Sequence, residues 1–160
     1  MRNPELSWDE CNIEAAKEAA RMRRALSEAM LDFGFETVGS HPSKIESLAE
    51  YKAMGYLVAV FFVTTESADI NVRRVEQRRR NGGHDVPEGK VRSRYDRTMS
   101  FLPEYLEVAD LMVVYDNSED HTVDDGQPPK LLLMKRGNAV TITDEGKSSL
   151  WLGKALNGEL

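Results

Sequence analysis

Residues 56–63 of the 160-residue chain read YLVAVFFV, an unbroken apolar run between Gly55 and the polar residues 64–67. A run of this length, rich in β-branched and aromatic residues, predicts a strand that is buried on both faces. Strands of this kind occur in parallel sheets that carry helices on both sides. Residues 111–115 (LMVVY) predict a second buried strand, which ends in the polar residues 116–118.

Two capping-box motifs predict helices before the first of these strands. SWDE at residues 7–10 predicts a helix over residues 9–32, and SKIE at residues 43–46 predicts a helix that reaches about residue 54. A glycine follows each predicted helix and marks its end. Between the two helices, residues 35–38 (FETV) predict a short strand.

The alternation of strands and helices predicts an α/β fold with a mainly parallel sheet flanked by helices. Residues 131–134 and 139–142 are short apolar stretches around a Lys-Arg-Gly turn, and they predict a small C-terminal hairpin. A last helix is expected around Trp151. At this length we expect one domain, residues 1–160.

Composition places the chain among ordinary globular proteins, with 41% hydrophobic and 30% charged residues. The single Cys11 excludes an internal disulfide and fits a reducing compartment. No apolar run approaches the length of a transmembrane helix, so we expect a cytoplasmic protein without a membrane partner. The three histidines are scattered, without cysteines or paired carboxylates beside them, so no metal site is expected.

The segment 73–97 is strongly basic. It holds nine lysines and arginines against four acidic residues, a local charge of +5 in a chain whose net charge is −6. Gly82 and Gly83 stop one predicted helix, and Pro87 opens another that Pro103 interrupts, so a helical lid is expected over about residues 67–108. Forked arginine donors suit phosphate, so the pair predicts an anion site. The alternative is a pair of solvated helices whose arginines meet local acids; we favour the anion site because those acids are few.

Glu36 lies in the apolar stretch 35–38, where a charge needs a partner or a function. The carboxyl end of a parallel strand opens on the crevice where α/β proteins bind ligands. A ligand contact and a structural ion pair both remain open for Glu36.

Several segments together resemble the zeta-toxin-like P-loop kinases, from about Asn3 to the end of the chain. They are FETVGSHPSK at 35–44, GY at 55–56, RVEQR at 74–78, GGHDVPE at 82–88, RSRYDRT at 92–98 and VYDNS at 114–118. The resemblance implies a P-loop NTPase-like sheet that transfers the γ-phosphoryl group of ATP, with Mg²⁺, to a small acceptor hydroxyl. In the characterised toxins of this family the acceptor is UDP-N-acetylglucosamine. An antitoxin is the partner that the family implies.

The resemblance also assigns roles to individual residues. The implied catalytic residues are Glu5, Arg78 and Arg94, and the implied substrate-binding residues are Glu36, Thr37 and Arg92. Glu5 stands where the family carries its general base. The arginines would hold phosphates from the lid, with Arg92 as the alternative to Arg94, and Glu36 would bind the acceptor.

The chain departs from the family in one respect. No Gly-x-x-x-x-Gly-Lys-Ser/Thr motif occurs in its sequence, although phosphoryl transfer in this class relies on that loop. We therefore expect a kinase domain that lacks its first strand and P-loop, either shortened or a natural remnant, and that is inactive by itself.

The alternative function is a non-catalytic module that binds a phosphorylated ligand, such as a nucleotide sugar, or a protein partner. The sheet edge exposed without a first strand would favour contact with a second copy or another segment. A nucleic-acid partner is not expected, because aromatic residues do not interleave with the basic ones as base stacking requires.

Overall fold

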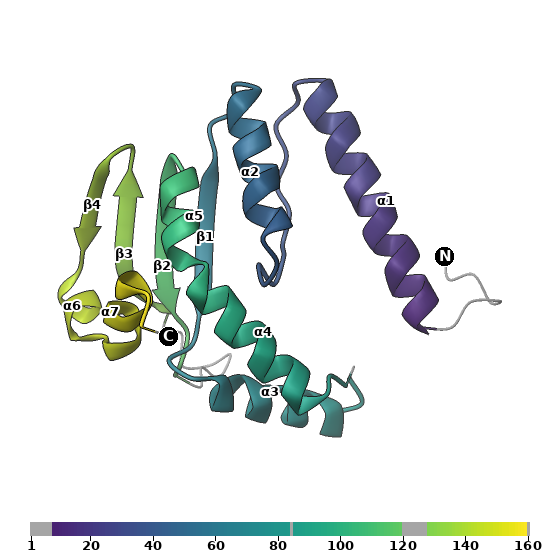
Figure 1. Cartoon of the computed structure of the whole chain (residues 1–160). Coiled ribbons are helices and arrows are strands. Elements are labelled where there is room, and N and C mark those ends of the chain that lie inside the picture. Colours follow the sequence, from purple (N-terminus) through teal and green to yellow (C-terminus); the bar gives the residue numbers. More distant parts are fainter. Residues whose placement is uncertain (1–7, 84, 120–127, 160) are drawn as a thin grey trace. The chain divides into compact units, whose positions relative to one another are not determined.

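The computed structural model describes residues 8–83, 85–119 and 128–159, and Figure 1 shows their elements in chain order. The chain divides into two compact units, residues 1–37 and residues 38–160. The first unit contains helix α1 (Trp8–Glu28). Among the described residues, no helix is both long and apolar enough to cross a membrane.

The described part of the second unit contains a four-stranded sheet in the order β1-β2-β3-β4. The strands are β1 (Ala59–Thr64), β2 (Leu111–Asp116), β3 (Lys130–Arg136) and β4 (Ala139–Ile142). β1 and β2 pair in parallel, whereas β2 with β3 and β3 with β4 pair antiparallel. The α/β class and the C-terminal hairpin, which turns at Gly137, are confirmed. The sheet is mixed, however, and not mainly parallel.

Six helices accompany this sheet in the described residues of the second unit. They are α2 (Ser43–Ala53), α3 (Ala68–Arg80), α4 (Glu88–Ser100), α5 (Leu102–Val108), α6 (Asp144–Ser148) and α7 (Leu150–Asn157). The break between α4 and α5 falls at Phe101, and Pro103 lies in the first turn of α5. The predicted interruption near this proline is therefore confirmed.

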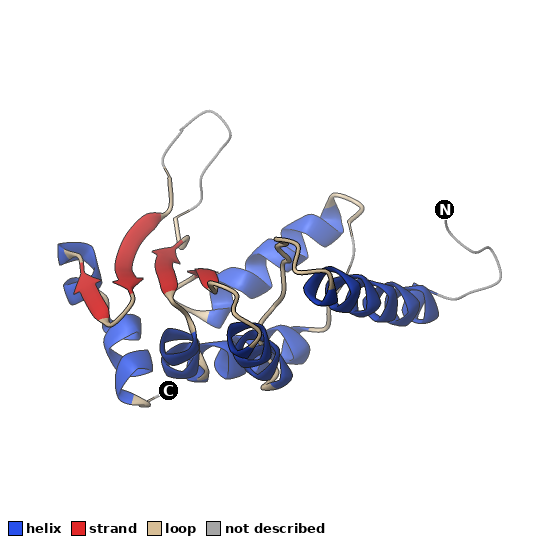
Figure 2. Cartoon of the chain, turned by 90° about the horizontal axis from the view of Figure 1, so that it is seen from above, coloured by secondary structure: helices blue, strands red, loops and turns tan. Residues whose placement is uncertain are grey.

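The core lies on one face of the sheet. Phe62, Val114 and Leu133 are buried cross-strand neighbours on that face. Leu102 and Tyr105 of α5 cover them, together with the buried residues of α7, and Ile45 and Leu48 of α2 pack at the margin. Figure 2 shows α5 and α7 on the same side of the strands.

The opposite face of the sheet is open, so the prediction that residues 56–63 are buried on both faces is wrong. Phe61 is 75% exposed and Val63 is 56% exposed, whereas their neighbour Phe62 is buried. The reason is topological, because the core helices of this unit pack against the Phe62 face and β1 is an edge strand.

Helix α1 ends at Glu28, short of the predicted residue 32. Met30 has a left-handed backbone with a φ of 54°, and the N–H of Leu31 donates to the carbonyl of Leu26 at 3.1 Å. This is the Schellman arrangement that ends many helices, usually with glycine in the left-handed position. No local pattern predicts this helix end, because methionine rarely adopts that conformation.

The predicted strand at residues 35–38 is absent, since residues 31–40 have no regular structure. Side chains of α4 and α5 occupy the carbonyls that a strand would offer to a neighbour. The donors are Thr98 Oγ1 to Val38 (2.9 Å), Tyr105 OH to Gly39 (3.2 Å) and Arg97 Nε to Ser40 (3.2 Å). Gly39 is required here, because its φ is +68° and a Cβ would lie 2.9 Å from the Tyr105 hydroxyl.

The capping box predicted at residues 43–46 is also absent, although the helix itself forms. Pro42 occupies the N-cap position, and Ser43 is the first residue of α2. The N–H of Ser43 donates to Nδ1 of His41 at 3.2 Å, so the imidazole serves the helix start. The box at residues 7–10 includes Ser7, which lies outside the described residues.

Gly146 provides a stability test of the junction between β3 and α6. A Cβ at this position would lie 2.1 Å from the carbonyl oxygen of Leu132. We expect Gly146→Ala to lower the free energy of unfolding by about 1–3 kcal/mol. Gly153→Ala is the matched control, because nothing lies within 4 Å of its Cβ, and alanine inside a helix should stabilise by about 0.5–1 kcal/mol. Urea unfolding measures both, and equal effects would contradict this packing.

Candidate functional site

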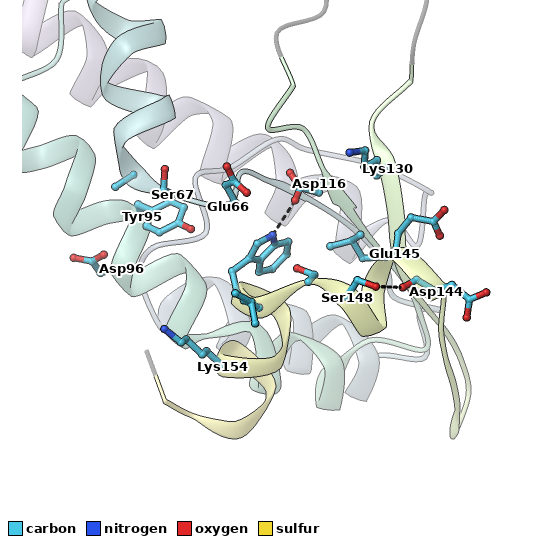
Figure 3. Close-up of a pocket in the computed structure, with 15 residues that line it drawn as sticks. Glu66, Ser67, Tyr95, Asp96, Asp116, Lys130, Asp144, Glu145, Ser148 and Lys154 are labelled. Carbon is cyan, nitrogen blue, oxygen red and sulfur yellow. Dashed lines mark hydrogen bonds between the residues drawn. The ribbon is translucent and has the colours of Figure 1, made fainter.

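The described residues form an open pocket of ≈ 970 Å³ where β1 and β2 end, and Figure 3 shows its lining. Residues 66–68 line it after β1, and Asp116 lines it as the last residue of β2. Helix α4 contributes Tyr95 and Asp96, and α6 and α7 close the other side. The pocket therefore lies at the carboxyl ends of the parallel strands, where open α/β sheets bind ligands.

The lining of this pocket is acidic and aromatic. Its carboxylates are Glu66, Asp96, Asp116, Asp144 and Glu145, its ammonium groups are Lys130 and Lys154, and its large aromatic side chains are Tyr95 and Trp151. Five negative charges thus face two positive ones. A bare phosphate is disfavoured there, whereas hydroxyl groups can donate to the carboxylates.

Asp116 organises the wall between the strands and α7. One carboxylate oxygen, Oδ2, accepts a hydrogen bond from Trp151 Nε1 at 2.9 Å (Figure 3). The other, Oδ1, accepts from the backbone N–H of Ser118 at 2.8 Å and from the Ser118 hydroxyl. The Ser118 hydroxyl in turn accepts from the N–H of Glu66 at 2.7 Å. These bonds join the turns that follow β1 and β2, so this wall is positioned in advance of any ligand.

Tyr95 is a neutral donor at the pocket. Its hydroxyl donates to the carbonyl of Thr65 at 2.9 Å. Burial raises the pKa of Tyr95 to about 12, and the carboxylates of Asp116, Asp96 and Glu66 add to the shift. The phenol therefore stays protonated at neutral pH and does not serve as a base.

The predicted lid is a hairpin of α3 and α4, held together by Arg92. Its guanidinium contacts Asp69 on α3 at 2.6 Å and Glu88 on α4 at 2.8 Å. The hydrogen bonds to Glu88 and Asp69 raise the pKa of Arg92. In this arrangement Arg92 is engaged in two ion pairs, of which the one with Asp69 connects the two helices.

Other lid arginines have structural partners too. Arg79 and Arg80 both contact Glu76, at 3.2 and 3.0 Å. Arg74 donates to the carbonyls of Asn117 (2.7 Å) and Glu119 (2.9 Å) after β2. For Arg79 and Arg80, the alternative in which the arginines meet local acids describes the structure. No local pattern predicts the role of Arg74, because its acceptors are main-chain carbonyls that are distant in sequence.

Arg94 differs from these residues. It is half-buried on α4 and makes no ion pair or hydrogen bond to the described residues. Arg94 lies one turn before Thr98 and therefore shares a helix face with Thr98. The Thr98 hydroxyl donates to the carbonyl of Val38. Arg78 is exposed near the end of α3. Glycine is needed at position 83, because a Cβ on that residue would lie 2.6 Å from the Arg78 Cγ.

The remaining predicted site residues lie in the first unit. Glu36 and Thr37 are exposed and belong to no strand, so the premise of a carboxylate in a core strand is wrong. Their expected meeting with the lid arginines stays a prediction, because those arginines belong to the second unit. Glu5 lies outside the described residues.

Sequence reasoning missed the pocket itself. Asp116 was recognised only as part of a polar turn at a strand end, and Trp151 only as a residue of the last helix. The sequence feature that could have indicated the pocket is Asp116, a carboxylate at the carboxyl end of a buried strand. Its partner, the indole of Trp151, is distant in sequence.

No protein-family model, no curated protein and no solved structure matches this chain. The resemblance to zeta-toxin-like kinases therefore depends on the quoted sequence motifs alone. Within the part of the chain that the structure describes, no three His, Cys, Asp or Glu side chains are grouped so that they could hold a metal ion.

Tyr95 gives the pocket a testable dependence on alkaline pH. Its folded pKa of about 12 exceeds the ordinary value of 10, so its stabilising effect is complete below pH 10 and is lost as the pH rises toward 12. Tyr95→Phe loses one hydrogen bond, so the wild type should be about 1 kcal/mol more stable near neutral pH. Urea unfolding should show that advantage shrinking between pH 10 and pH 12. An advantage that is constant with pH would contradict the assignment.

Proposed function

We propose that residues 38–160 bind a small phosphorylated, hydroxyl-rich ligand of the nucleotide-sugar type at the carboxyl ends of β1 and β2. The observation that carries the proposal is the acidic and aromatic pocket beside the basic lid. Such a ligand is the acceptor class that the resemblance to zeta-toxin-like small-molecule kinases implies.

The pocket chemistry suits the hydroxyl-bearing part of the ligand. Ionised carboxylates only accept hydrogen bonds, and sugar hydroxyls can supply the donors. Glu145 and Asp96 line the pocket with exposed side chains, and Trp151 offers an aromatic surface already fixed by Asp116. Because its walls are held by hydrogen bonds, little ordering is needed on binding.

The phosphate part needs cations outside the carboxylate cluster. Arg94 on the lid is half-buried and has no partner among the described residues; it is the neighbour of the pocket residue Tyr95 but does not itself line the pocket. Lys154 supplies an ammonium group at the pocket itself. Arginine can bind phosphate through two parallel hydrogen bonds. We therefore assign the phosphate to Arg94 and Lys154, and the hydroxyl groups to the carboxylates.

ATP and Mg²⁺ do not fit the residues at hand. The sequence contains no glycine-rich loop with lysine and Ser/Thr to cradle the β- and γ-phosphates. Asp116, the carboxylate at the strand end, is already engaged by Trp151 and Ser118. The proposed activity of this 160-residue chain is therefore ligand binding, and phosphoryl transfer is not assigned to it.

Titration with UDP-N-acetylglucosamine tests the site. Arg94→Gln should weaken binding about tenfold or more, because a hydrogen bond to a charged group contributes about 1.5–3 kcal/mol. Arg136→Gln is the matched control, since this exposed arginine lies at the amino end of β2 by register and should leave affinity unchanged. N-acetylglucosamine and inorganic phosphate should each bind more weakly than the whole ligand. Calorimetry that shows no binding at millimolar ligand, or equal losses in both variants, would refute the proposal.

The same chain should not transfer phosphate from ATP to that ligand. Loss of a single preorganised donor commonly costs about 10²–10³ in rate, and here a lysine, a hydroxyl and several amides are lacking together. Radiolabelled γ-phosphate should remain on ATP under conditions where the ligand is bound. Transfer at a kinase-like rate of about 1 s⁻¹ or more would show that another phosphate cradle exists within these 160 residues.

A further inference from the structure

β1 presents an unpaired edge in the second unit. Its carbonyls at Val58, just before the strand, and at Thr64 accept from the N–H groups of Leu111 (3.1 Å) and Asn117 (2.7 Å). Because bonded residues alternate in a parallel ladder, the main-chain groups of Ala59, Phe61 and Val63 point away from β2. Only an extended backbone at strand spacing can satisfy such a row of donors and acceptors.

This edge lacks the features that normally protect an edge strand. β1 reads AVFFVT, with no charge, proline or glycine, and its exposed side chains are large and apolar. The other edge strand, β4, is shorter and has four residues. An unprotected strand of this composition is suited to pairing with another chain.

We propose that β1 pairs antiparallel with β1 of a second copy of this chain, joining the two sheets. A register with Phe61 opposite Phe61 and Ala59 opposite Val63 places all these side chains on the same open face. Cross-strand aromatic and β-branched pairs stabilise such a ladder. This inference is independent of the proposed ligand site.

Charge favours the antiparallel orientation. The amino end of the parallel pair carries Lys52, Lys135 and Arg136, with the carboxylates of Asp110 and Glu107 beside them, so basic groups outnumber acidic ones there. The carboxyl end carries Glu66, Asp116 and Glu119, with Lys130 and Arg74 as cations beside them, so acidic groups outnumber basic ones there. Antiparallel pairing brings the acidic end of one copy to the basic end of the other, whereas a parallel arrangement would bring like ends together.

Sedimentation velocity on the full chain over a concentration series is the first test. A strand pair alone is smaller than the roughly 800 Å² per partner of a standard interface, so we expect a dimer that dissociates on dilution. Val63→Lys should abolish it by placing a charge on the edge. Val140→Lys is the matched control, because Val140 lies on the other edge strand and is 50% exposed against 56% for Val63. It should leave the dimer intact.

Val63→Pro provides a second variant, which removes a backbone donor and adds no charge. The N–H of Val63 points outward in this ladder, so proline removes an edge donor without removing a bond to β2. It should also give a monomer. Thermal unfolding verifies that both Val63 variants remain folded.

Cross-linking tests the register. In a Cys11→Ser background, Phe61→Cys should form an intermolecular disulfide on mild oxidation, because opposite residues in antiparallel strands lie about 4.5–5.5 Å apart between Cα atoms. Val140→Cys should not. A wild type that is monomeric at all concentrations, a dimer that survives both Val63 variants, or cross-linking at residue 140 instead of 61 would overturn the proposal.

Discussion

The direct parallel pairing of β1 with β2 is the constraint on which the second unit depends. Two parallel neighbours cannot be joined by a tight turn, so the chain must leave the carboxyl end of β1 and return to the amino end of β2. Helices α3 and α4 make the outward part of this connection, and α5 runs back along the sheet and packs into the core (Figure 1). The basic lid therefore lies at the carboxyl ends because of the strand pairing.

Polar contacts fix that pairing at both ends. At the amino end, Asp110 accepts from the N–H of Val58 and from Lys52, both at 2.9 Å, and these hydrogen bonds lower the pKa of its carboxyl group. At the carboxyl end, Ser118 and Arg74 hold the turns after the two strands. The pocket wall formed by Asp116 and Trp151 is part of the second set of contacts. Sheet geometry and the candidate site are thus coupled through a few residues.

The sequence predicted local features well. The position of β1, the glycine-stopped helices around Gly55 and Gly82, and the interruption near Pro103 follow from short-range propensities, and the structure contains all of them. The prediction that β1 is buried on both faces was wrong, because an apolar run does not reveal whether one or two layers of helices cover the strand. The prediction of a strand at residues 35–38 was wrong: Thr98 takes the carbonyl of Val38 and other side chains take the next two carbonyls. Such distant partners leave no local pattern in the sequence.

In the candidate site, too, the sequence predicts local features but not contacts between distant residues. The basic character of residues 73–97 is visible in the sequence. Charge alone, however, does not separate Arg92, which connects two helices, from Arg94, which makes no ion pair or hydrogen bond to the described residues. The acidic side of the site escaped prediction since its carboxylates come from segments as far apart as Glu66 and Glu145. The proposed arrangement, with phosphate on the lid and hydroxyl groups in the pocket, accounts for both charges.

Backbone amide NMR during a titration with UDP-N-acetylglucosamine tests this account most directly. The account predicts that the largest shift changes fall on residues 65–68, 92–98, 116–118 and 150–154, which surround the carboxyl ends of β1 and β2. Changes concentrated instead at the amino ends, around residues 52–58 and 108–111, would contradict it, as would the absence of any change at saturating ligand.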